Sequence, residues 1–172
     1  MLWNDTFLEL FDRCLAFYKR GVRNYNSYYS DDDLAFLASI GYKPRELFDF
    51  VEDFGSRGVP TISTALLVAA VRRDYFTVVQ GGVPSTAKEV TSSDVPARDE
   101  NFDGIPYLPR LIAKAEAKLR GELDPDLMFC CGSDRNFLYS YGQIPPADFL
   151  RHVWAADGDF DKIAKFVRSY KS

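Results

Sequence analysis

Two stretches of the chain repeat one another in the same order, and this self-similarity constrains the fold more than any other feature of the sequence. Residues 33–51 read DLAFLASIGYKPRELFDFV, and residues 134–153 read DRNFLYSYGQIPPADFLRHV. An aspartate, a Phe-Leu pair, a serine and a glycine recur at constant spacing, and one extra residue in the second stretch then restores the match up to a shared valine. Such a pattern is typical of a duplicated structural unit.

Each copy has the apolar spacing of α-helices. The first predicted helix follows Asn4 or Asp5 as its N-cap, carries apolar residues three and four positions apart, and ends at Gly21. Its counterpart in the second copy ends at Gly121, and a longer helix is predicted over residues 61–80. We therefore expect an all-α, or nearly all-α, protein with two degenerate copies of a three- to four-helix unit related by pseudo-twofold symmetry.

Shorter helices are predicted between these longer ones. Ser30 and Ser133 are the expected N-caps, because hydroxyl side chains accept hydrogen bonds from first-turn amides. Pro44 in the first copy, and Pro145 or Pro146 in the second, are expected to start the next helices, since proline fits the first helical turn. A final helix is predicted over residues 160–170.

The chain divides into a first helical repeat at residues 1–80, a linker arm at residues 81–106 and a second helical repeat at residues 107–172. The linker is rich in Gly, Pro, Ser, Thr and Asp and has neither helical nor strand periodicity. Its path is either irregular throughout or includes a short hairpin near Gly81 and Gly82. Linkers of this length are often functional loops or wrapped arms.

Charge and composition exclude several classes of partner. The net charge of -4 comes from 21 basic and 25 acidic side chains spread along the chain, so we expect no nucleic-acid binding. The start of the chain lacks the basic segment of a signal peptide, and the longest apolar run is far shorter than the ~20 residues that span a bilayer. Three cysteines, two of them adjacent, suit a reducing compartment. We expect a cytoplasmic protein with no membrane partner.

The first predicted helix is apolar on both sides. Phe7 and Phe11 lie on one face, and Leu10 and Cys14 lie on the other. Such a helix is either central in the fold or part of a subunit contact. We therefore expect a homodimer.

The stretch GIPYLPRLIAKAEAKLRGELDPDLMFCCGSDRNFLYSYG resembles the family catalogued as domain of unknown function 5069. The resemblance is carried by the Leu-Pro-Arg run ending at Arg110, by Lys114, by the small and basic residues up to Gly121, and by an aspartate and Phe-Leu before Gly142. It covers residues 96–170, and Ala113 stands where an acidic residue often precedes the lysine in that family. The resemblance implies a small helical protein of bacterial type and supplies no reaction.

A row of cationic residues marks the second copy. Arg110, Lys114 and Lys118 are four residues apart on one predicted helix, where like charges repel. Two interpretations stay open. The row is a solvated face relieved by nearby acids and salt, or Arg110 and Lys114 face an anionic ligand or the acids Asp134 and Asp148.

A second charged cluster, RRDYF, follows seven apolar residues in the first copy. Charges that enter a core must be paired, so Arg72 or Arg73 pairs with a nearby carboxylate, or Arg73 and Tyr75 line a site.

His152 is the only histidine and is expected on the side of a helix, partly buried, with proton transfer as the alternative.

Cys130 and Cys131 are adjacent. Neighbouring cysteines form only a strained disulfide, and two thiolates do not complete the four ligands of a structural zinc. Buried structural thiols are the preferred interpretation, and redox-sensitive, metal-binding or nucleophilic thiols are the alternatives. We expect neither a metal nor another cofactor.

Two functions of different class follow from these residues. The preferred one is a ligand-binding or protein-interaction module, because no phosphate loop, dinucleotide fingerprint, nucleophile elbow or metal spacing is present. The alternative is a cofactor-free enzyme with an anionic small-molecule substrate between the two repeats, which leaves open whether the protein is an enzyme. The candidate ligand-binding residues are Arg110, Lys114, Arg73 and Arg135, and the candidate catalytic residues are Asp134, Tyr75 and His152.

Overall fold

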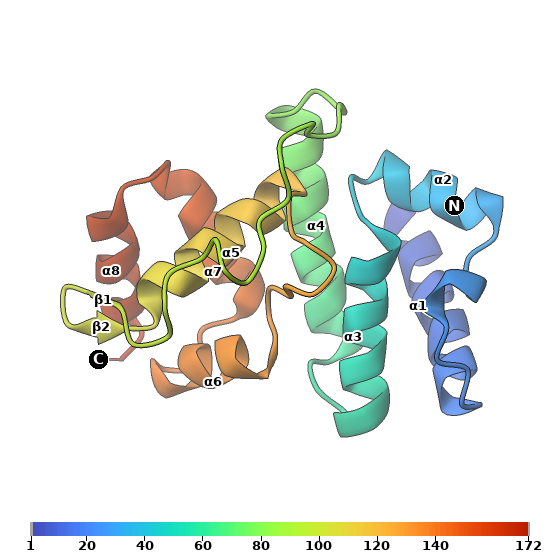
Figure 1. Ribbon diagram of the computed structural model, residues 1–172, viewed down its shortest axis with the longest axis horizontal. Helices are drawn as coiled ribbons and strands as arrows, with labels where there is room; N and C mark the ends of the chain where they lie inside the picture. The colour runs from blue at the N-terminus through green and yellow to red at the C-terminus, as the bar shows by residue number, and fades with distance from the viewer. Residues whose placement is uncertain (1, 172) are drawn as a thin grey trace. The chain divides into compact units, whose positions relative to one another are not determined.

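The computed structural model describes residues 2–171 and confirms a helical protein, with one very short pair of strands in this range (Figure 1). The chain forms two compact units, Met1–Pro84 and Ser85–Ser172. Most of the predicted linker arm therefore belongs to the C-terminal unit. Among the described residues, no helix has both the length and the apolar character needed to cross a membrane.

The N-terminal unit consists of four helices and a short 3-10 turn. Its first helix packs against the third and the fourth, and the third also packs against the fourth. The core between them is formed by aromatic and aliphatic side chains such as Phe7, Phe11 and Leu47. The elements are α1 (Trp3–Lys19), η1 (Tyr25–Ser27), α2 (Asp31–Ser39), α3 (Pro44–Arg57) and α4 (Ile62–Val78).

The C-terminal unit begins with an irregular arm and continues into two strands and four helices. Helix α5 packs against α7 and strand β1, and α7 packs against α8. The arm is tied to the loop after α5, because Val90 donates a backbone hydrogen bond to the Glu122 carbonyl at 2.7 Å. The elements are β1 (Asn101–Phe102), β2 (Ile105–Pro106), α5 (Leu108–Arg120), α6 (Gly132–Ser140), α7 (Pro146–Ala156) and α8 (Phe160–Ser169).

Both apolar faces of α1 are covered within the N-terminal unit. Phe7 and Phe11 are fully buried, and so are Leu10 and Cys14 on the other face. The apolar surface that suggested a subunit contact is therefore used by contacts inside one chain. The homodimer stays a prediction without this support.

The short hairpin forms at a different place from the one considered. Strands β1 and β2 are antiparallel and are joined by Asp103 and Gly104, whose φ angles are 51° and 74°. Two central residues with positive φ match the tight turn that suits the twist of a hairpin. Around Gly81 the chain instead leaves the end of α4, which continues to Val78.

The starts of two helices differ from the predictions. Helix α1 begins at Trp3, because the carbonyl of Leu2 already accepts hydrogen bonds from the amides of Asp5 and Thr6. Helix α6 begins at Gly132 with Cys131 as its N-cap, so Ser133 lies inside the first turn. The predicted cap of α2 is confirmed, as Ser30 accepts a hydrogen bond from the third helical amide, and Thr61 plays the same part for α4.

The two units share several local features. Helices α2 and α6 each have nine residues, and each is closed at its start by a capping box that uses Asp33 or Asp134. Each is followed by a glycine with positive φ, at 69° for Gly41 and 101° for Gly142. These features support the internal repeat predicted from the sequence, which stays a prediction.

Candidate functional site

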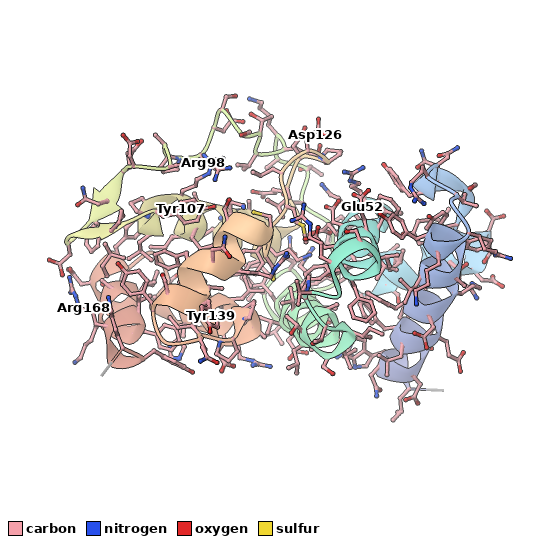
Figure 2. All side chains as sticks on the ribbon, turned by 90° about the horizontal axis from the view of Figure 1, so that it is seen from below. Glu52, Arg98, Tyr107, Asp126, Tyr139 and Arg168 are labelled. Carbon is pink, nitrogen blue, oxygen red and sulfur yellow. The ribbon has the colours of Figure 1, made fainter. Side chains whose placement is uncertain are left out.

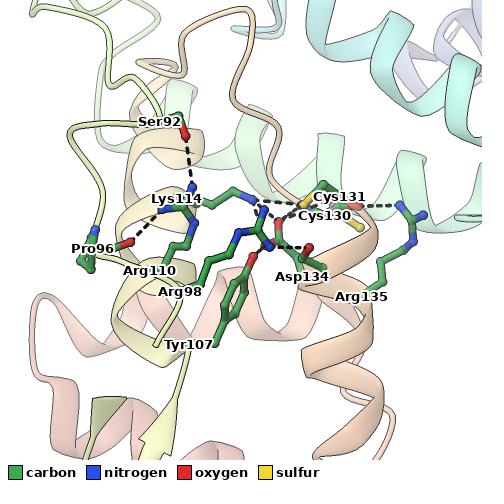
Figure 3. A network of polar contacts seen from close by, with 11 residues as sticks. Ser92, Pro96, Arg98, Tyr107, Arg110, Lys114, Cys130, Cys131, Asp134 and Arg135 are labelled. Atoms are coloured by element: carbon green, nitrogen blue, oxygen red, sulfur yellow. Dashed lines mark hydrogen bonds and ion pairs between the residues drawn. The ribbon is translucent and has the colours of Figure 1, made fainter. Parts of the chain in front are cut away.

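A buried ion pair between Lys114 of α5 and Asp134 of α6 lies at the centre of the polar contacts in the C-terminal unit (Figure 3). The lysine Nζ donates to Asp134 Oδ2 at 2.6 Å and to Oδ1 at 2.8 Å. Only 3% of the lysine side chain and 0% of the aspartate side chain are exposed. Charges buried this deeply are retained in a fold only when they are paired and hydrogen-bonded, so this pair fixes α5 against α6.

Three further donors bind the Asp134 carboxylate. The Tyr107 hydroxyl donates to Oδ1 at 2.8 Å, and the backbone amides of Cys130 and Cys131 donate to Oδ2 at 2.8 and 3.2 Å. With the two bonds from Lys114, the carboxylate accepts five hydrogen bonds, which fills the lone-pair positions of its two oxygens. Asp134 is therefore held in one orientation from α5, from the turn before α5 and from the turn before α6.

Tyr107 reaches this carboxylate from the turn before α5. Its backbone is left-handed, with φ of 71°, and its ring lies against the Phe137 ring with centroids 5.8 Å apart. Burial, followed by the charge of Asp134, raises the pKa of Tyr107 well above its usual value. The hydroxyl thus stays protonated at neutral pH and acts as a hydrogen-bond donor.

The two adjacent cysteines have different environments. Cys130 is fully buried with φ of 72°, and burial raises the pKa of its thiol to about 12. Cys131 is only partly buried, and its Sγ lies 3.4 Å from Lys114 Nζ. The prediction of buried thiols is therefore confirmed for Cys130 and holds only in part for Cys131. Arg135 steadies this turn by donating to the Cys130 carbonyl at 2.7 Å.

Two arginines connect the irregular arm to the ion pair. Arg110 is buried on α5 and donates to the Pro96 carbonyl at 2.8 Å and to Ser92 Oγ at 3.3 Å. Arg98 of the arm is exposed and donates to Ser133 Oγ, in the first turn of α6, at 2.8 Å. Figures 2 and 3 both show Arg98 close to Tyr107.

The structure distinguishes between the two interpretations of the cationic row. Arg110, Lys114 and Lys118 are all buried, so the interpretation as a solvated face is wrong. Lys114 faces Asp134, as the other interpretation proposed. Asp148 does not share this role, because its carboxylate contacts Arg151 of its own helix at 3.1 Å and the Tyr170 hydroxyl at 3.5 Å.

The remaining candidate residues lie elsewhere. His152 is exposed on α7, with its ring stacked on Phe166 of α8 at 3.5 Å between centroids, so the prediction of a partly buried ring is wrong. Arg73 and Tyr75 belong to α4 of the N-terminal unit, where Arg73 contacts Asp74 at 3.4 Å and lies over the Trp3 ring. The network around Asp134 is built from residues of the C-terminal unit.

The N-terminal unit carries a more open version of the same ion pair. Arg13 of α1 binds the carboxylate of Asp33, which also accepts hydrogen bonds from Ser30. Here 50% of the arginine side chain and 15% of the aspartate side chain are exposed. Water competes for such a pair, so the buried version in the C-terminal unit is the better candidate for a specialised site.

Sequence reasoning missed Tyr107 and Arg98. Tyr107 has no periodic signal because it lies in a turn, where its backbone is left-handed. Arg98 lies in the irregular arm, whose path the pattern of residues does not predict. The recurrence of Asp33 at Asp134 marks the starts of α2 and α6, but it does not indicate which residues of the arm reach the start of α6.

Comparison with known proteins found no matching family model, no matching curated protein and no matching solved structure. The resemblance to the domain of unknown function 5069 therefore stays a prediction.

Proposed function

We propose that the C-terminal unit is a binding module for a small anionic molecule with a carboxylate or phosphate group, bound at the start of α6 next to the Lys114–Asp134 pair. The observation that carries this proposal is an excess of positive charge. Arg98, Lys114 and Arg135 bond to groups at the start of α6, and Arg110, on the same helix as Lys114, bonds to the arm; Asp134 is the carboxylate at the centre of this cluster (Figure 3). In a chain with a net charge of -4, such a cluster stands out.

The members of this cluster contribute in two ways. Arg110 and Lys114 are buried and bonded to protein oxygens, so they act on a ligand through their charge. Arg98 is exposed and places its guanidinium beside the first turn of α6, where planar donors can bind a carboxylate or phosphate in pairs. The first amides of a helix have no acceptor within the helix and also favour an anion. Arg98 and the first turn of α6 are the expected direct contacts.

The same geometry favours binding over proton transfer. Asp134 is completely buried and its carboxylate accepts five hydrogen bonds, so it is poorly placed to take a proton from a ligand. Tyr107 has a raised pKa and keeps its proton at neutral pH. A general base must be both reachable and deprotonated, and neither residue meets both conditions.

The internal repeat gives this proposal a context. If the two units arose by duplication, the N-terminal unit kept an exposed Arg13–Asp33 pair and the C-terminal unit acquired the buried Lys114–Asp134 pair covered by the arm. The arm is then the part that distinguishes a binding unit from a scaffold unit.

Calorimetric titration tests the proposal with inorganic phosphate, pyrophosphate, succinate and citrate at low ionic strength. We expect at least one anion to bind, with affinity that falls as salt is added. Arg98→Ala should weaken its Kd about ten- to hundredfold, because a hydrogen bond to a charged group contributes roughly 1.5–3 kcal/mol. Arg151→Ala is the matched control, since Arg151 is an exposed arginine on α7 paired with Asp148. Absence of binding, or an equal loss in both variants, would contradict the proposal.

A further inference from the structure

The contact between Lys114 and Cys131 brings a primary amine next to a thiol. Lys114 Nζ lies 3.4 Å from Cys131 Sγ, and the same nitrogen is 2.6 Å from Asp134 Oδ2. Cys131 is partly exposed, whereas the lysine side chain is almost completely buried. Cys131 is thus partly accessible to a small oxidant from solvent, and its sulfur is in contact with the buried Lys114 nitrogen. The anion-binding function uses neither of these properties.

We propose that Cys131 is a redox-sensitive modification site, at which oxidation by a hydroperoxide leads to a covalent sulfenamide bond between Cys131 Sγ and Lys114 Nζ. This cross-link would join the middle of α5 to the N-cap of α6.

The reaction has two steps, and both balance. In the first, the Cys131 sulfur is oxidised by two electrons to a sulfenic acid, while the peroxide O–O bond breaks and the hydroperoxide is reduced to water or an alcohol. In the second, the neutral Lys114 amine attacks this sulfur, an S–N bond forms, the S–O bond breaks and water leaves. In the second step the sulfur keeps the oxidation state that it has in the sulfenic acid, so no further oxidant is needed.

Asp134 is placed to act as the proton acceptor in the second step. The amine must lose a proton before it can attack, and the Asp134 carboxylate oxygen at 2.6 Å is placed to accept it. Within a buried pair this transfer replaces two desolvated charges by two neutral groups. The water that leaves can carry the second proton away on the exposed side of Cys131.

Cys130 is the competing partner for the sulfenic acid, and its environment disfavours it. Its thiol is fully buried, and a pKa raised to about 12 leaves little thiolate at neutral pH. A disulfide between neighbouring cysteines also requires a strained ring. The amine of Lys114 therefore has the better access to the Cys131 sulfur.

The cross-link would also change the site. It removes the ammonium charge of Lys114 and with it the partner of Asp134, next to the proposed anion-binding position. Added thiols reverse a sulfenamide, because two thiols restore the amine and the cysteine and leave as a disulfide. The bond is thus a reversible response to oxidant.

The test treats the full chain with hydrogen peroxide, blocks the remaining thiols and maps tryptic peptides by mass spectrometry. We expect a loss of two hydrogen atoms, with Lys114 no longer cleaved and its peptide joined to the peptide that contains Cys131. Dithiothreitol should restore both separate peptides. Cys130→Ser should keep the cross-link, which separates it from a disulfide of the same mass.

Two variants complete the test. Cys131→Ser should abolish the cross-link and keep the fold, because serine caps helices well. Lys114→Arg keeps a cationic partner for Asp134 and should lose the cross-link, while Cys131 becomes trappable as sulfenic acid by dimedone. A Cys130–Cys131 disulfide, an accumulation of sulfinic acid in the unmodified sequence, or no change at Cys131 under excess peroxide would each overturn the proposal.

Discussion

Lys114 and Asp134 approach to 2.6 Å between Nζ and Oδ2 and link the middle of α5 to the first turn of α6 in the interior of the C-terminal unit. The same carboxylate also binds Tyr107 and the turn that carries Cys130. One side chain therefore joins a helix, a capping box and the turn before α5. Removing it would leave a buried ammonium without its counter-ion and three further donors without this acceptor.

This relationship predicts a large difference between two aspartates in equivalent positions of their helices. Asp134→Ala should lower the free energy of unfolding of the C-terminal unit by about 3–5 kcal/mol, because it leaves an uncompensated buried charge. Asp33→Ala should cost only about 1 kcal/mol, since it removes a helix cap and an exposed ion pair. Urea unfolding of both variants measures the difference, and equal losses would contradict the buried pair as a central element.

The sequence predicts the helices well for a physical reason. Apolar residues at helical spacing and glycines at helix ends act locally, so α4 and α8 lie close to their expected bounds and α3 begins at the expected Pro44. The start of α6 was shifted because cysteine is not among the preferred N-caps, although Cys131 fills that position through the Asp134 capping box. The N-cap rule fails at α6 because cysteine, which is uncommon at this position, is the N-cap.

The site was predictable only in part. The four-residue spacing of the cationic row pointed to Lys114, and the repeat pointed to Asp134. Whether the row faces solvent or core depends on how the arm folds over α5, and the arm has no periodic pattern. Tyr107 and Arg98 come to the site through that arm and its turn, so single-sequence reasoning could not find them.

Gly142 should be far more sensitive to substitution than Gly158. Both have positive φ, at 101° for Gly142 and 82° for Gly158. A Cβ added at Gly142 would lie 2.2 Å from the Tyr170 carbonyl oxygen, whereas a Cβ added at Gly158 would have no neighbouring atom within 4 Å. Gly142→Ala should therefore cost at least about 3 kcal/mol and Gly158→Ala only about 1 kcal/mol. Thermal unfolding of the two variants gives the comparison, and similar melting temperatures would refute a close approach of α8 to this turn.

The N-cap of α6 permits a prediction about two conservative changes. Cys131→Ser should leave the stability of the C-terminal unit within about 0.5 kcal/mol or raise it, because Ser30 already caps α2 in this way. Cys131→Ala should lower the stability by about 1 kcal/mol, since no side chain then accepts from the third amide. Denaturant midpoints of both variants decide the matter, and a more stable alanine variant would show that the cap contributes nothing.

Burial of Cys130 predicts how stability depends on alkaline pH. The folded state raises the thiol pKa from 9.0 to about 12, so the folded chain keeps a proton that the unfolded chain releases. The unfolded state binds fewer protons over this interval, and the free energy of unfolding therefore falls as pH rises above about 9. The stabilising contribution is fully present below the unfolded-state pKa and is lost as pH approaches the folded-state value.

Replacing the Cys130 thiol shows how much of the stability lost at alkaline pH is due to this group. Cys130→Ser removes a group that titrates in this interval, so the variant should lose less stability than the unmodified sequence between about pH 8 and about pH 10.5. Urea unfolding at both pH values measures the two slopes, and Cys131→Ser is the control that retains Cys130. Parallel slopes for all three chains would mean that the Cys130 thiol is as accessible to solvent when folded as when unfolded, which is incompatible with its place under the turn before α6.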